Sequence, residues 1–186
     1  MVTISFVCEK GGVGKTTLAN ELRFYFKRCG LRCSLYGVDG QYRKGSYVVD
    51  DPDVLVVDTP GRIDTRLQDV IERSDLVVVP VRPTPNDTEP FLRTVRLVRD
   101  LTDVPLIVVV NGMNAFTVAK SFSGWLESQD LADKIVYVPQ SEAIVQATGA
   151  GRSVVYADRY GRATEAIEHF GDTVSLLSGI GAMVHV

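Results

Sequence analysis

The chain has 186 residues, of which 45% are apolar and 23% charged, with a formal net charge of −3 at pH 7. This is the composition of an ordinary globular protein, and we expect one domain over residues 1–186 with a substantial core. No apolar run is long enough to span a bilayer and no signal peptide precedes the first strand, so a cytoplasmic location is expected. The slight acidity excludes nucleic-acid binding through overall charge and leaves only a local basic patch.

Six apolar runs of strand length recur along the chain, and stretches of helical pattern separate them. The predicted strands are Thr3–Cys8, Cys33–Gly37, Val54–Asp58, Leu76–Val81, Leu106–Asn111 and Ile135–Val138. The predicted helices are Leu18–Cys29, Thr65–Arg73, Glu89–Leu101, Val118–Ser128 and Glu142–Thr148. Continuous apolar runs suit strands buried on both faces of a parallel sheet. The pattern predicts an α/β three-layer sandwich, a mostly parallel twisted sheet flanked by helices, with ligands at the carboxyl ends of the strands.

A glycine-rich loop stands between the first predicted strand and the first predicted helix. Its sequence is Lys10-Gly11-Gly12-Val13-Gly14-Lys15-Thr16-Thr17, which fits the phosphate-loop pattern G-x-x-x-x-G-K-[ST] except that Glu9 replaces the first glycine. The alternative is an ordinary glycine-rich turn, but such a loop exposes N–H groups to a polyphosphate at the positive end of a helix dipole. We therefore predict that residues 11–17 bind a nucleotide, with Lys15 at the β- and γ-phosphates and the Thr16 hydroxyl on Mg²⁺.

The third predicted strand ends in a carboxylate. Val54–Val57 are four consecutive apolar residues, and Asp58 follows them directly. With a phosphate loop upstream, this pattern predicts an aspartate beside Mg²⁺, acting directly or through a bound water. The alternative is a strand-end aspartate that caps the next loop.

The lysine at position 10 is not required by an ordinary phosphate loop. With it, the octapeptide resembles the deviant Walker A box of the ParA/MinD family of P-loop ATPases, and is most similar to the small plasmid-partition ParA ATPases. In that family the early lysine reaches across a dimer interface to the nucleotide of the partner subunit. The resemblance therefore implies ATP or ADP, Mg²⁺ and a homodimer formed with ATP through a catalytic Lys10, next to the catalytic Lys15. The alternative is a solvated loop lysine.

The end of the second predicted strand departs from that family. The family usually shows Asp-x-Asp-Pro-Gln there, and Asp39 and Gln41 match its second aspartate and its glutamine. The resemblance implies that Asp39 positions the attacking water, although a turn aspartate is the alternative. Gly37 and Gly40 replace the other two residues, which points to slow or altered hydrolysis. Only residues 42–53 then lead to the next strand, where the family usually has a helix.

The fourth predicted strand and its following loop carry a second family pattern. Residues 74–87 resemble the partition ATPase sequence S/A-D-L-V-x-x-P-V-x-P-S-P-x-D. The prolines predict a rigid loop near the γ-phosphate that could move with the nucleotide state. We expect Asp87 to cap the helix that follows.

Two further positions are assigned to the adenine base through the same resemblance. Asn111 ends the fifth predicted strand, where the family tends to place an asparagine that hydrogen-bonds adenine. The loop around Pro139, after the sixth strand, would flank the base. An asparagine that caps a turn is the alternative for Asn111.

Two sets of arginines are candidates for contacts with the DNA backbone. One set recurs every third residue on a predicted helix, and comprises Arg93, Arg96 and Arg99. The other lies near the C-terminal end, and comprises Arg152, Arg159 and Arg162. The alternative for each set is a solvated helix face. The tail, residues 174–186, is apolar without basic residues, so we expect core or dimer packing and no stable membrane association.

The resemblance covers residues 2 to about 170 and implies a ParA-type ATPase. Such a protein would dimerise with ATP, bind nonspecific DNA on the nucleoid, segregate plasmid DNA and release it on hydrolysis stimulated by a ParB-like partner. Three alternatives stay open. The first is the same ATPase moving another cargo, the second a MinD-like membrane ATPase, and the third a nucleotide-binding interaction module with negligible turnover.

Overall fold

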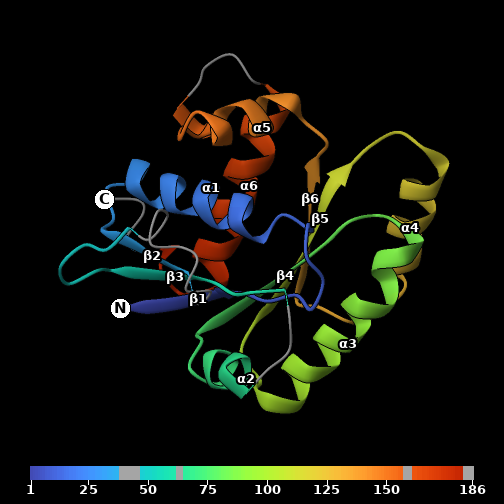
Figure 1. Ribbon diagram of the computed structural model, residues 1–186, viewed down its shortest axis with the longest axis horizontal. Helices are drawn as coiled ribbons and strands as arrows, with labels where there is room; N and C mark the ends of the chain where they lie inside the picture. The colour runs from blue at the N-terminus through green and yellow to red at the C-terminus, as the bar shows by residue number, and fades with distance from the viewer. Residues whose placement is uncertain (38–46, 62–64, 157–160, 182–186) are drawn as a thin grey trace.

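A single parallel sheet organises the chain in the computed structural model, which describes residues 1–37, 47–61, 65–156 and 161–181. Its strands are β1 (Val2–Phe6), β2 (Cys33–Gly37), β3 (Val54–Asp58), β4 (Leu76–Val81), β5 (Leu106–Met113) and β6 (Lys134–Pro139). They lie in the order β2-β3-β1-β4-β5-β6, and each neighbouring pair is parallel (Figure 1). Strand order reverses beside β1, so the ends of β1, β3 and β4 form the crevice where ligands bind in such sheets.

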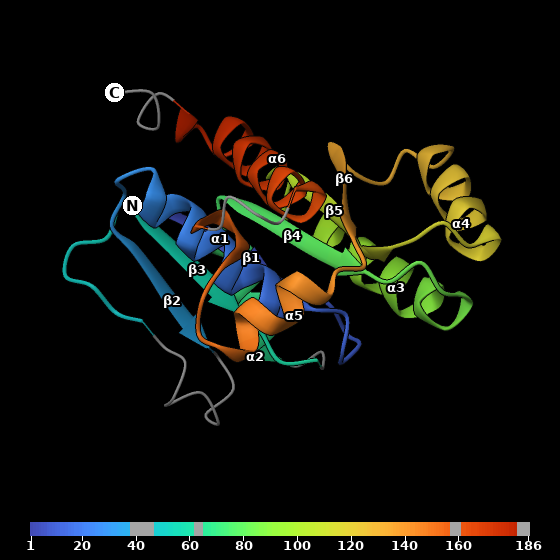
Figure 2. The same cartoon turned by 90° about the horizontal axis from the view of Figure 1, so that it is seen from above.

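Helices cover both faces of this sheet. They are α1 (Lys15–Arg28), α2 (Thr65–Glu72), α3 (Pro85–Leu101), α4 (Thr117–Glu127), α5 (Glu142–Gly149) and α6 (Arg162–Leu177), with a short 3₁₀ helix, η2, at Val154–Tyr156. Helices α1, α5 and α6 lie on one face, and α2, α3 and α4 lie on the other (Figures 1 and 2). This arrangement confirms the predicted α/β three-layer sandwich. None of the helices among the described residues is both long and apolar enough to cross a membrane.

Strands β4 and β5 contribute side chains to the hydrophobic cores on both faces of the sheet. On β4, Val78 packs under α1 and α6, whereas Val77 and Val79 pack under the helices of the opposite face. β5 shows the same alternation from Leu106 to Val110. Side chains on successive strand residues point to opposite faces, so a continuous apolar run fills both layers at once. The continuous runs in the sequence are therefore explained by burial on both faces.

Helix α6 is an element that the sequence analysis did not predict. It packs along α1 (Figure 1), and Gly171 lies against the Tyr25 ring of that helix. A Cβ at Gly171 would lie 2.4 Å from Cγ of Tyr25, so only glycine lets the two helices approach this closely. The Tyr25 hydroxyl donates a 2.5 Å hydrogen bond to the Asp172 carboxylate beside it. Val174 and Ile180 are buried, as expected of a tail that packs in the core, and residues 182–186 lie outside the described part of the chain.

The start of α3 also differs from the prediction. The helix begins at Pro85, four residues before the predicted start at Glu89. Pro85 occupies the first helical position, where its fixed φ suits the helix and its missing N–H removes no helical hydrogen bond. Pro90 lies inside the helix. The N-cap residue is Thr84, so the expectation that Asp87 caps this helix is wrong. Asp87 lies in the first turn instead, and it accepts a 2.7 Å hydrogen bond from the Thr84 hydroxyl.

Candidate functional site

The glycine-rich loop joins the end of β1 to the start of α1. Gly12 and Gly14 have φ angles of +78° and +97°, a backbone conformation that favours glycine. Gly14 is the N-cap residue of α1, and no side chain caps the helix there. The first backbone N–H groups of α1 are therefore left for a ligand, and the helix dipole favours an anionic one.

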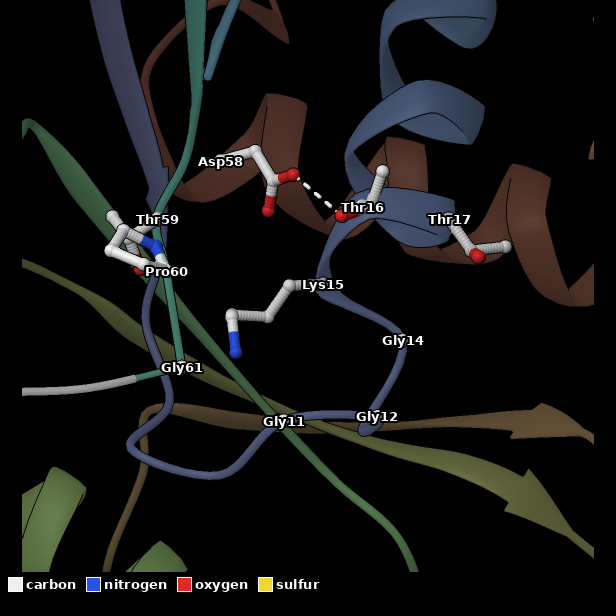
Figure 3. A pocket seen from close by; sticks show the side chains of 10 residues that line it. All are labelled: Gly11, Gly12, Gly14, Lys15, Thr16, Thr17, Asp58, Thr59, Pro60 and Gly61. Carbon is white, nitrogen blue, oxygen red and sulfur yellow. Dashed lines mark hydrogen bonds between the residues drawn. The ribbon is translucent and has the colours of Figure 1, made fainter. Parts of the chain in front are cut away.

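A cavity of about 380 Å³ lies between this loop and the residues that follow β3 (Figure 3). It is lined by Gly11, Gly12, Gly14, Lys15, Thr16, Thr17, Asp58, Thr59, Pro60 and Gly61. The structure thus gathers six of the seven predicted loop residues with the predicted aspartate. Val13 is the exception, because its side chain is buried in the protein and does not line the cavity.

Lys15 extends into the space between the loop and the end of β3 (Figure 3). Its ammonium donates two hydrogen bonds of 3.0 Å, to the carbonyl oxygens of Cys8 and Lys10. Burial lowers the pKa of Lys15, and the nearby Asp58 carboxylate counteracts part of that shift. The loop thus holds a buried cation beside the positive end of α1, which is a setting that suits a highly charged anion.

The side chains of Thr16 and Asp58 meet on one wall of the cavity (Figure 3). The Thr16 hydroxyl, in the first turn of α1, donates a 2.6 Å hydrogen bond to the Asp58 carboxylate at the end of β3. A hydroxyl and a carboxylate are oxygen ligands of the kind Mg²⁺ takes beside nucleotide phosphates. Within the described residues, no group of three or more His, Cys, Asp or Glu side chains could hold a metal by itself. The oxygen pair therefore fits an Mg²⁺ that is shared with phosphates and water.

Two close approaches of the backbone define the shape of the cavity. A Cβ at Gly61 would lie 2.9 Å from the backbone nitrogen of Gly11, so the segment after β3 rests directly on the phosphate loop. Gly61 was missed by the sequence analysis, although its place after Asp58-Thr59-Pro60 was a usable signal. A Cβ at Gly14 would lie 2.1 Å from the side-chain amide nitrogen (Nδ2) of Asn111. Gly61 requires glycine because backbone atoms leave no room for a side chain, whereas Gly14 is favoured as glycine by its φ of +97°.

Asn111 contacts the phosphate loop directly. Its side-chain amide donates a 2.9 Å hydrogen bond to the carbonyl oxygen of Val13. Pro139, the other residue assigned to the base, ends β6 and lines a separate cavity of about 490 Å³ with Met113 and Tyr137. The structure therefore places Asn111, but not Pro139, against the phosphate loop, and their contacts with adenine stay a prediction.

Lys10 is bound within its own chain. Its ammonium forms an ion pair with the Asp87 carboxylate and donates a 3.1 Å hydrogen bond to the carbonyl oxygen of Asn86. Both partners lie in the first turn of α3. The predicted contact of Lys10 with the nucleotide of a partner subunit thus stays a prediction. In this structure the Lys10 side chain contacts α3 of its own chain.

The second predicted strand end is only partly described. Gly37 lies beside Asp58 in the parallel register of β2 and β3. The residue that replaces the usual first aspartate therefore stands next to the proposed Mg²⁺ ligand. Asp39 and Gln41 lie outside the described residues, as does Arg159.

The two arginine sets lie on opposite faces of the sheet. The first is on α3, where Arg93 pairs with Glu9 and Glu89, and Arg99 pairs with Asp133. Its third member, Arg96, is exposed. The second set belongs to the face of α5 and α6, where Arg152 follows α5 and Arg162 begins α6. Among the described residues, one monomer therefore does not join members of the two sets into one basic patch.

A family model matches residues 4–177 of the chain, and it is described as the CobQ/CobB/MinD/ParA nucleotide binding domain. No curated protein sequence matches the chain.

Solved structures with this fold cover nearly all of the chain. The MinD cell division protein of Aquifex aeolicus has 18% identity and a TM-score of 0.77 over 94% of this chain and 96% of its own. A putative plasmid partition protein of Borrelia burgdorferi, bound to AMPPNP, has 16% identity and a TM-score of 0.72 over 90% and 97%. The septum site-determining protein MinD of Pyrococcus horikoshii, complexed with Mg-ADP, has 16% identity and a TM-score of 0.71 over 97% and 98%. At such low sequence identities, these structures show only that the chain shares their fold.

Proposed function

The chain belongs to the CobQ/CobB/MinD/ParA family of nucleotide-binding domains, and on that premise we propose that it is a ParA-type ATPase that works as a dimerisation switch. ATP with Mg²⁺ favours a C2 dimer in which Lys10 of each subunit reaches the nucleotide of the other. The dimer binds nonspecific DNA, and hydrolysis returns it to monomers. A switch of this kind requires ATP to bind the dimer better than the monomer.

One observation carries the proposal: Lys15, Thr16 and Asp58 converge on one cavity beneath the uncapped N-terminus of α1. The buried Lys15 ammonium suits the β- and γ-phosphates, and the two oxygens of Thr16 and Asp58 suit Mg²⁺. Gly61 supports a switch, since its segment rests on the phosphate loop and is positioned to respond when that loop is filled. Bound ATP and Mg²⁺ would supply the reactive γ-phosphoryl group and neutralise its charge.

Hydrolysis is proposed to be slow without a partner. Asp39 is the proposed group that positions the attacking water, by its resemblance to the family. Gly37 leaves the end of β2 without a carboxylate next to Asp58, which is the position where the family usually has its first aspartate. A ParB-like partner protein is the proposed stimulator of turnover, and plasmid DNA is the proposed cargo.

The proposed DNA binding uses contacts with the phosphate backbone of the DNA and none with the bases. Arg93 and Arg99 are already paired with carboxylates of their own chain, which favours Arg96, Arg152 and Arg162 as contacts with phosphates. With a net charge of −3, the monomer has no general attraction for DNA. Dimerisation is therefore the step that would bring enough arginines together.

The experiment is binding to a long nonspecific duplex with ATP, ADP or no nucleotide, at two salt concentrations. We expect binding only with ATP, weaker at the higher salt because counterions are released on binding. Replacing Arg152 and Arg162 by glutamine should weaken it, and Lys15→Ala should abolish it. If the wild type dimerises with ATP but binds no DNA, another cargo is favoured, and ATP-dependent sedimentation with anionic vesicles would favour a membrane ATPase.

A further inference from the structure

The first two residues of the phosphate loop are tied to helix α3 by several contacts, among them the 3.1 Å hydrogen bond from the Lys10 ammonium to the Asn86 carbonyl oxygen. Lys10 forms the ion pair with Asp87, and Glu9 pairs with Arg93 through both of its carboxylate oxygens, at 2.8 and 3.2 Å. The backbone N–H of Glu9 also donates a 3.1 Å hydrogen bond to the Thr94 hydroxyl. We call these contacts the α3 brace. They join the loop to a helix some eighty residues further along the chain.

The Lys10–Asp87 pair is the member of the brace with the largest energetic consequence. The Asp87 side chain is only 5% exposed, while the Lys10 side chain is 35% exposed. A second oxygen of Asp87 is held by the Thr84 hydroxyl, so the carboxylate is fixed in place. Removing the cation from a buried carboxylate is unfavourable, because that charge then lacks both solvent and a partner. Lys10 can therefore leave Asp87 only at a cost in free energy.

The Glu9–Arg93 pair holds the same segment from the other side. Arg93 also contacts Glu89, at 2.7 Å, so one guanidinium bridges two carboxylates. These three side chains are more exposed than Asp87, and exposed pairs contribute little each. Their contribution is geometric: they keep Glu9, and with it the start of the loop, against α3. This also gives Arg93 a use other than DNA binding.

We propose that Asp87 is a positioning residue that holds Lys10 within its own subunit and so sets the free-energy cost of dimerisation. The inference rests on the proposed function in one respect, the use of Lys10 across the dimer interface. Lys10 must exchange the Asp87 carboxylate for the partner's nucleotide when the dimer forms. The brace thus keeps the monomer from dimerising until the nucleotide offers Lys10 a stronger partner.

This predicts that weakening the pair makes the dimer tighter. In Asp87→Asn, Lys10 loses its ion pair but Asn keeps the shape and can still accept from Thr84. Each C2 dimer frees two lysines, so a threefold gain per subunit multiplies to about tenfold in the dimer dissociation constant. Asp87→Glu retains the charge and should lie near the wild type. Asp87→Ser serves as a second neutral variant if Asp87→Asn folds poorly by circular dichroism.

Dimerisation is measured by sedimentation equilibrium with Mg²⁺ and a nonhydrolysable ATP analogue. Asp100→Asn is the matched control, since it removes the same charge from the last turn of the same helix. The double variant with Lys10→Ala tests whether Asp87 acts through Lys10: the gain seen in Asp87→Asn should vanish in that background. A dimer of Asp87→Asn that is unchanged or weaker than the wild type overturns the proposal.

A second readout does not depend on dimers. In nucleotide-free protein, competitive acetylation read by mass spectrometry compares the reactivity of Lys10 with that of the exposed Lys134. We expect Lys10 to react several-fold faster in Asp87→Asn than in the wild type or Asp100→Asn. If Lys10 reacts equally fast in Asp87→Asn and in the wild type, the proposal is overturned even if the dimer forms. A wild type that never dimerises with nucleotide, but shows faster Lys10 labelling in Asp87→Asn, overturns the proposed function while Asp87 still holds Lys10.

Discussion

The Thr16 hydroxyl donates a 2.6 Å hydrogen bond to the Asp58 carboxylate, which links the first turn of α1 to the end of β3. The two residues are 42 positions apart in the chain, and they meet because β1 and β3 are parallel neighbours in the sheet. A hydroxyl and a carboxylate thereby share one wall of a cavity that Lys15 also lines. This relationship is the basis for the metal-dependent part of the proposed nucleotide binding.

Thr16→Val tests that part, because valine keeps the shape of threonine without its hydroxyl. We expect the affinity for ATP in the presence of Mg²⁺ to fall by about tenfold, the equivalent of about 1.4 kcal/mol. The affinity in the presence of a chelator should stay close to that of the wild type. Fluorescence titration with a labelled ATP, with Mg²⁺ and with a chelator, measures both affinities. An equal loss under the two conditions would place Thr16 outside the metal site.

Gly61→Ala tests the contact between the segment after β3 and the phosphate loop. The new Cβ would lie 2.9 Å from the Gly11 nitrogen, so the loop backbone must move, and we expect at least a tenfold loss of nucleotide affinity by calorimetry. Gly124→Ala is the matched control, because a Cβ there meets nothing within 4 Å. In the interior of α4, that alanine should raise the free energy of unfolding by about 0.5–1 kcal/mol. A Gly61→Ala protein with wild-type affinity would show that the contact has no role in the site.

Asn111→Ala separates two roles for the amide. The structure shows the Asn111 side chain bonded to the Val13 carbonyl of the phosphate loop, whereas the family resemblance implies a contact with adenine. If the amide positions the loop, binding of inorganic tripolyphosphate should weaken together with binding of ATP. Competition with a labelled nucleotide measures both ligands. A loss confined to ATP would assign Asn111 to the base alone.

The phosphate loop, Asp58 and the order of strands and helices could be predicted because each depends on residues that are close in sequence. Gly11–Thr17 form their loop by local glycine chemistry, and the strands appear as unbroken apolar runs. The contacts Lys10–Asp87 and Gly61–Gly11 could not be predicted, since the strand order β3-β1-β4 brings these residues together. Helix α6 was missed, and the glycine at its centre is explained only by the Tyr25 ring that lies against it.

Glu21 predicts a pH dependence of stability. It is buried on α1 and accepts hydrogen bonds from the Ser153 hydroxyl and the Val154 backbone, and burial raises its pKa above the ordinary value of 4.5. The folded protein therefore keeps a proton that the unfolded chain has already released, so stability falls as pH rises from 4.5 through the raised pKa.

Glu21→Gln removes this titration, and its stability relative to the wild type should increase across that range. Urea unfolding of both proteins between about pH 4.5 and pH 8 measures the difference. A difference that does not change with pH would mean that the Glu21 carboxyl titrates alike in the folded and unfolded states.

The most direct test of the dimerisation switch is the mass in solution, measured by light scattering with Mg²⁺ and ATP, with ADP and without nucleotide. We predict twice the 20.4 kDa of the monomer with ATP, and the monomer mass in the other two conditions. Lys10→Ala should stay monomeric with ATP but still bind ATP, because the proposed role of Lys10 is to contact the nucleotide of the partner subunit. A wild-type mass that ATP does not change, or a Lys10→Ala protein that dimerises as the wild type does, would contradict the account.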